Sequence, residues 1–252
     1  MSDPAAEIRK ALAELEEAAS TTGQHGSRGV REPERKRKRA TRRRRWSGRR
    51  LVGLTLTALV AILLPFWVLV RGTTILALEA GWGPWGSLAG AAVATTALIG
   101  VYAWGASRKL GVGTGRWLPR LSAGVVMAYC AYGLLFMSPR QFKGPEVQET
   151  WSSMHPALRM ALATMVLVDS DAVITDGARR PEDYAGMNLP VNARSLHFEQ
   201  TDGYVHAVDL RTLGRPEWLN AAVTVYLRSV GISVLRHVGT ADHLHVYLSP
   251  AS

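Results

Sequence analysis

The sequence is almost free of cysteine, because Cys130 is the single one among its 252 residues. One thiol cannot form an intrachain disulfide, and it cannot build a cysteine-rich zinc cluster. Any metal site in this chain must therefore be made of histidine and carboxylate ligands.

Acidic residues are also scarce: 20 Asp or Glu stand against 30 Lys or Arg, a net charge of +10. Residues 1–50 carry +8 of this charge, with fifteen basic and seven acidic residues. Such a segment is typical of a disordered tail, and basic tails bind either nucleic acid or anionic lipid headgroups. An uncharged apolar run follows directly, which favours lipid headgroups and makes nucleic acid an unlikely partner.

Charge is absent from three long apolar segments, residues 51–70, 85–106 and 121–138. Twenty helical residues span about 30 Å, the thickness of the hydrocarbon core of a bilayer. The sequence thus predicts a membrane domain over residues 51–140 with three transmembrane helices. No ionisable residue lies inside these segments, which argues against a pump or proton relay.

The charged residues in the loops between the apolar segments predict the orientation of the chain in the membrane. The loop between the second and third spans holds four basic residues and no acid, whereas the first loop holds only Arg71 and Glu79. The positive-inside rule then predicts a cytoplasmic amino terminus and an extracytoplasmic carboxy-terminal domain in a multi-pass protein. The first apolar run begins only at residue 51, so it is not a cleaved signal peptide.

Residues 144–252 have the composition of one soluble domain. Helical spacing in "HPALRMALATMVLV" and "RPEWLNAAVTVYLRSVG" predicts two helices. Strands are predicted in "DAVITDGARRPEDY", "YVHAVDL", "ISVLRHVG" and "HLHVYLS". This order predicts an α+β fold, an antiparallel sheet with helices on one face.

Histidines gather in this domain, with five of the seven in the last 56 residues. Residues two apart in a strand share a face, so His243 and His245 point the same way. His206 points away from the face of Asp209, which favours His197 as the partner of that carboxylate.

Four short motifs resemble the zinc D-alanyl-D-alanine carboxypeptidase and dipeptidase superfamily, which includes phage endolysins and shares its fold with the Hedgehog signalling domain. They are Ser195-Leu-His197, "AVDL" with Asp209, Asp242-His243-Leu-His245, and a strand and turn that ends in Gly-x-Arg at Arg179. The resemblance covers residues 150–250.

Two features depart from the family pattern. Eleven residues separate His197 from Asp209 where the family has six, and Val205 stands where it has glycine. The insertion leaves His206 or Asp202 as alternative ligands.

The resemblance implies a Zn²⁺ ion on His197, Asp209 and His245, with water in the fourth position. It implies Asp242 as the general base and His243 as a stabiliser of the transition state. Relatives use either position for the base, so the sequence leaves the opposite assignment open.

For the remaining site residues, the resemblance implies that Arg179 binds a peptide carboxylate or the developing oxyanion. It also implies that Ser195 orients a ligand.

The expected function is that of a bacterial membrane-anchored metallopeptidase. It would hydrolyse peptidoglycan stem peptides with metal-activated water, as a D-Ala-D-Ala carboxypeptidase or a related endopeptidase. The alternative is a zinc-stabilised, non-catalytic cell-wall binding domain.

Overall fold

The computed structural model describes residues 48–111, 117–186, 192, 194–239 and 241–249, together with Lys10, Ala13, Glu14 and Glu16. The predicted basic tail, residues 1–50, lies almost entirely outside these ranges. The chain divides into two compact units, residues 1–54 and 55–252, and the contacts described below belong to the second.

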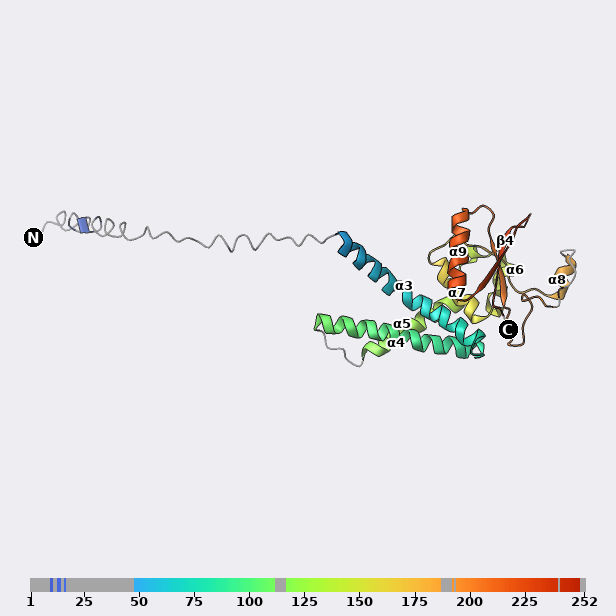
Figure 1. Cartoon of the computed structure of the whole chain (residues 1–252), viewed down its shortest axis with the longest axis horizontal. Helices are drawn as coiled ribbons and strands as arrows, with labels where there is room; N and C mark the ends of the chain where they lie inside the picture. Colours follow the sequence, from blue (N-terminus) through green and yellow to red (C-terminus); the bar gives the residue numbers. More distant parts are fainter. Residues whose placement is uncertain are drawn as a thin grey trace, which may run out of the picture. The chain divides into compact units, whose positions relative to one another are not determined.

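Three long apolar helices come first: α3 (Gly48–Leu78), α4 (Pro84–Leu110) and α5 (Trp117–Leu135) (Figure 1). Each is long and apolar enough to cross a membrane, which confirms the three predicted segments. Their bounds differ from the prediction. The first helix runs on to Leu78, and the third begins at Trp117 and ends at Leu135 instead of covering residues 121–138.

Local sequence explains where α4 begins and ends. Pro84 opens the helix in the first-turn position, where its missing N–H costs nothing. Gly111 ends it with φ 67°, a left-handed conformation that glycine adopts without strain, and its N–H bonds to the carbonyl of Ser107.

Small residues allow α3 and α4 to pack closely. A Cβ atom on Gly72 would lie 3.2 Å from Cβ of Ala91, and one on Gly90 would lie 2.7 Å from Cδ1 of Leu76. Larger side chains would separate the two helices, so these glycines serve packing within the chain.

The remainder of the chain is a small α+β domain. Its elements are α6 (Pro145–Glu149), α7 (Pro156–Val166), β1 (Ile174–Asp176), α8 (Pro181–Gly186), β2 (Ala207–Arg211), α9 (Glu217–Ser229), β3 (Ser233–His237) and β4 (His243–Tyr247), with short 3₁₀ turns at Pro139–Gln141 and Thr150–Ser153. The sheet order is β1-β2-β4-β3, and every neighbouring pair is antiparallel. The predicted mixture of helices and an antiparallel sheet is confirmed.

Strand β2 begins later than the sequence pattern predicts. β2 begins only at Ala207, because the residues before it bond elsewhere: the N–H of Val205 donates to Ser153 and that of His206 to Leu196. These bonds hold the segment before β2 against two other loops.

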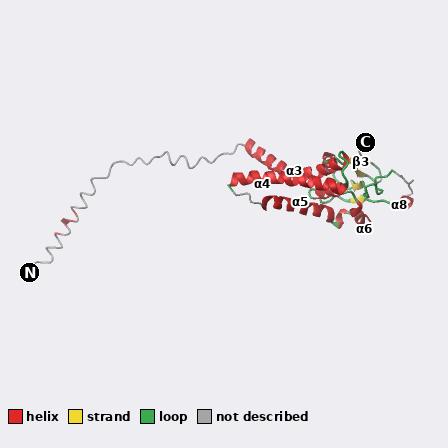
Figure 2. Ribbon diagram, turned by 90° about the horizontal axis from the view of Figure 1, so that it is seen from below, coloured by secondary structure: helices red, strands yellow, loops and turns green. Residues whose placement is uncertain are grey.

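Helix α7 joins this domain to the membrane helices. It is buried on nearly every side, including at Arg159, whose guanidinium donates to the carbonyl of Leu134 at 3.2 Å. Tyr226 Oη of α9 donates to the carbonyl of Ala161, and Tyr129 Oη of α5 bonds Thr164 Oγ1 one turn further along the helix. One hydrophobic core therefore runs from the bundle into the domain, which lies at one end of the helices (Figure 2).

Candidate metal centre

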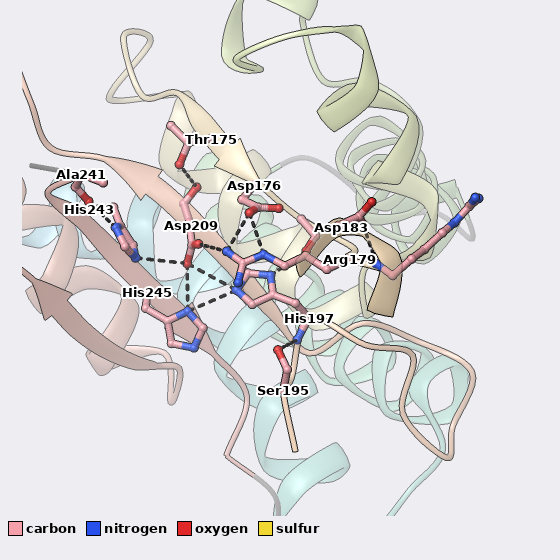
Figure 3. Close-up of polar contacts among 12 residues, drawn as sticks. Thr175, Asp176, Arg179, Asp183, Ser195, His197, Asp209, Ala241, His243 and His245 are labelled. Atoms are coloured by element: carbon pink, nitrogen blue, oxygen red, sulfur yellow. Dashed lines mark hydrogen bonds and ion pairs between the residues drawn. The ribbon is translucent and has the colours of Figure 1, made fainter. Parts of the chain in front are cut away.

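Two strands and one loop bring His197, Asp209 and His245 together (Figure 3). Asp209 of β2 lies directly opposite His245 of β4 in the antiparallel ladder, so their side chains share a face. His197 reaches the same point from the loop before β2. One ligand atom from each residue lies within 4.8 Å of the others, and we call this group the central cluster.

The distances within the central cluster suit a small cation. His245 Nδ1 lies 2.8 Å from Asp209 Oδ1, and His197 Nε2 lies 3.3 Å from His245 Nδ1. His197 and Asp209 are almost fully buried, whereas His245 is partly exposed. Two imidazole nitrogens and one carboxylate oxygen form the donor set of a three-ligand catalytic zinc site.

The backbone fixes the ring of His197. Its Nδ1 lies 2.6 Å from the carbonyl oxygen of Gly177, and because a carbonyl only accepts hydrogen bonds, Nδ1 must carry the proton. Nε2 then keeps its lone pair and faces Asp209 and His245, the orientation that metal-binding histidines have. A side chain at position 177 would collide with Thr150, so this carbonyl position requires glycine.

Ser195 also contacts His197. Its hydroxyl accepts the backbone N–H of His197 at 3.3 Å, and the backbone N–H of Arg179 donates to the carbonyl of His197 at 2.9 Å. The N–H and the carbonyl of His197 are therefore both hydrogen-bonded, which fixes its backbone.

Arg179 contacts the cluster directly. Its Nη2 donates to Asp209 Oδ2 at 2.9 Å and its Nε to Asp176 Oδ2 at 2.7 Å. Both carboxylates are held by one guanidinium, so Asp209 presents its other oxygen, Oδ1, to the two histidines. In this arrangement Arg179 is engaged with the protein itself rather than turned toward a substrate.

Opposing effects act on the Asp209 carboxyl. Burial by itself raises its pKa, but the interactions with the neighbouring His197 and His245 side chains outweigh burial and hold the pKa below its usual value. The carboxylate is therefore charged, as a metal ligand must be.

The structure separates the two neighbours expected to be catalytic. Asp242 pairs with Arg236, at 2.9 Å between Oδ2 and Nη2, and accepts the hydroxyl of Thr212 at 2.8 Å. His243 instead faces the central cluster, with Nε2 3.8 Å from Asp209 Oδ1 (Figure 3). Adjacent residues at the start of a strand point to opposite faces, so one sequence motif delivers only one of them to the site.

The ring of His243 is also oriented by the backbone. Its Nδ1 donates to the carbonyl of Ala241 at 2.6 Å, so Nε2 is the free acceptor. A cleft of about 740 Å³ opens over this face, and its lining includes His237, Tyr247, Tyr184 and Arg194. His237 stacks on His243 with the ring centroids 4.9 Å apart.

A second group, His155, Asp202 and His206, lies where the domain meets α4, and we call it the junction cluster. His206 Nε2 lies 2.8 Å from Asp202 Oδ2, and His155 Nε2 lies 3.7 Å from the same oxygen. The alternative ligands His206 and Asp202 thus belong here and not to the central cluster.

His155 has the wrong tautomer for a metal ligand at this point. Its Nδ1 accepts the backbone N–H of Ala157 at 3.1 Å and caps α7, so the neutral ring carries its proton on Nε2, the atom that faces Asp202. Binding a metal there would require the proton to move to Nδ1 and the cap to be lost. From the sequence alone His155 is interpreted as a satisfied polar residue rather than a ligand, and the helix cap is the contact that satisfies it.

Comparisons with family models, curated proteins and solved structures found no match to this chain. The central cluster therefore has to be interpreted from its own geometry.

Proposed function

We propose that the protein is a membrane-anchored zinc hydrolase that cuts peptide bonds in peptidoglycan stem peptides, as a D-Ala-D-Ala carboxypeptidase or related endopeptidase. The observation that carries the proposal is the central cluster: two imidazoles and one carboxylate, pre-oriented by Gly177 and Arg179, below an open cleft. A zinc ion on these ligands would lower the pKa of water and polarise a carbonyl group.

His197, Asp209 and His245 would hold the metal, and His243 would be the general base. His243 presents a free Nε2 beside Asp209, while both oxygens of Asp242 are engaged by Arg236. Imidazole is the side chain most often used for proton transfer in enzymes. The base is therefore assigned to His243 in place of Asp242.

Arg194 is the cation best placed to bind a substrate carboxylate. It lines the cleft and forms no ion pair with any residue that the structure describes, whereas the guanidinium of Arg179 is occupied by Asp176 and Asp209. An arginine fork binds a carboxylate in a bidentate manner. Replacing Arg194 with Ala should raise KM for a stem peptide with a free terminal carboxylate and leave KM for its amide unchanged.

The proposed location is the bacterial cell membrane, with the domain outside and the basic tail at the anionic inner leaflet. The carboxyl ends of α3 and α5 and the amino end of α4 all meet the domain, so an odd number of spans separates it from the tail. Protease added to wall-stripped cells should digest the domain and spare the tail.

The decisive experiment is a digest of defined muropeptides by the full chain with zinc, in nanodiscs, read by mass. Release of D-Ala or of a smaller stem peptide is expected, and the matched variant His197→Ala should release neither. If the zinc-loaded wild type releases nothing but retains muropeptides, the non-catalytic binding role replaces the enzyme.

A further inference from the structure

Helix α9 carries an exposed apolar stripe. Its residues recur at helical spacing along one face: Trp218, Ala221, Ala222 and Val225. Trp218 is 70% exposed and Val225 68% exposed. Nothing else in the described part of the domain covers this face.

The charged residues of α9 are held toward the sheet. Glu217 pairs with Arg236 of β3, and Arg228 donates to the carbonyl of Val234 at 2.9 Å. The stripe itself carries no charged residue, and an uncharged face beside a polar one is expected of a helix that lies at a membrane surface.

The stripe is continuous with the apolar surface of α3. Ser229 continues the same helical row, and its carbonyl accepts the indole N–H of Trp67 at 3.2 Å. Trp67 is itself exposed on α3, next to the exposed Leu63 and Leu59 one and two turns earlier. Figure 1 shows α9 running across the direction of α4 and α5, which places its axis along a bilayer that those helices cross.

A bilayer that surrounds α5 would extend along the helix as far as α9. Tyr129, which meets α7 at Thr164, lies only 12 residues or about 18 Å from Trp117 along the helix. A hydrocarbon core is about 30 Å thick, so a bilayer that begins near Trp117 extends past this point. Because α9 is bonded to α7 at Ala161, one turn away, the bilayer reaches α9.

We propose that the stripe of Trp218, Ala221, Ala222 and Val225 is a membrane-contact surface that lies in the bilayer interface and continues the lipid-facing side of α3. The domain would then rest on the lipid through α9 rather than hang from a free tether. This inference concerns the membrane part of the chain and does not depend on the hydrolase proposal.

Site-directed spin labelling of the full chain tests the surface. The variants are Trp218→Cys and Val225→Cys, with Leu235→Cys as the control, because Leu235 is also an exposed apolar residue but lines the cleft. The native Cys130 is buried, so the unmodified chain is the labelling blank. Each variant is placed in vesicles of phosphatidylcholine and phosphatidylglycerol, and collisions with oxygen and with a water-soluble nickel chelate are compared.

Labels at 218 and 225 should collide several-fold more with oxygen than with nickel, and the label at 235 should show the reverse. Equal nickel access at all three positions would overturn the proposal. So would spin–spin broadening at 218 and 225 that grows with the protein-to-lipid ratio, because it would assign the stripe to a second copy of the chain. If Trp218→Cys does not fold, Ala222→Cys on the same face replaces it.

Discussion

The central cluster and the junction cluster have the same composition, two histidines and one aspartate at similar distances, yet their chemistry differs. In the central cluster Nδ1 of His197 donates to a carbonyl, so the nitrogen that faces the aspartate is free to bind a metal. In the junction cluster Nδ1 of His155 accepts a backbone N–H, so the nitrogen that faces the aspartate carries a proton.

The hydrogen-bond partner of Nδ1 therefore decides whether Nε2 of the same ring can bind a metal. The carbonyl of Gly177 leaves Nε2 of His197 free to bind a metal, and the N–H of Ala157 makes His155 a helix cap. Distance between ligand atoms alone would not separate the two groups, since both satisfy it.

The largest expected difference between the two clusters is in the amount of metal that they bind. His197→Ala should reduce bound zinc from about one ion per chain to almost none, because two ligands do not retain a zinc ion against a chelator. His155→Asn should keep the full amount, because Asn also accepts an N–H at a helix N-cap. Metal analysis after dialysis measures both, and zinc loss in the second variant would put the metal in the junction cluster.

Catalysis should distinguish the neighbours Asp242 and His243. His243→Ala should lower kcat on a stem peptide by about 10²–10⁴-fold, the usual contribution of a positioned acid–base group, with zinc content unchanged. Asp242→Asn should leave kcat within a few-fold, since Asp242 faces Arg236 and Thr212. The opposite pattern in steady-state assays would return the base to Asp242.

The two clusters also differ in that the guanidinium of Arg179 donates to the aspartate of the central cluster. Arg179→Ala should weaken zinc affinity by about 10–100-fold, the usual cost of losing a group that orients a ligand. The exposed neighbour Arg180→Ala is the matched control and should leave affinity unchanged. Competition with a fluorescent zinc chelator measures the shift, and equal affinities in both variants would contradict the role.

The smallest effect concerns pH. Burial lowers the pKa of His155 to about 4, helped by His206 and Arg159 and opposed by Asp202. The unfolded chain takes up a proton near pH 6.5 that the folded chain refuses, so the free energy of unfolding should fall as pH drops from 6.5 toward 4. Melting temperatures of the wild type and His155→Asn at pH 7 and 5 measure this, and parallel losses in the two would exclude His155 as the cause.

Much of the architecture was predictable from the sequence. Uncharged runs of about twenty residues identify bilayer-spanning helices, because an exposed charge in lipid is costly. The sequence also separated His206 from Asp209, although His206 lies just before β2 and groups with His155 and Asp202. The ends of α3 and α5 were less accurate: α3 continues to Leu78, where its last turns pack against the domain, whereas α5 begins four residues earlier and ends three residues earlier than predicted.

Sequence alone determined the parts of this protein: three apolar helices and an antiparallel α+β domain. It also determined that the domain, which has no cysteine, can offer a metal only histidine and carboxylate ligands. Tertiary structure decided how those parts act. Which nitrogen of a histidine carries the proton, which of Asp242 and His243 faces the cluster, and that Arg179 holds Asp209 all depend on partners from distant segments. No local pattern encodes those partners, because hydrogen bonds between residues 20 to 48 positions apart exist only once the chain has folded.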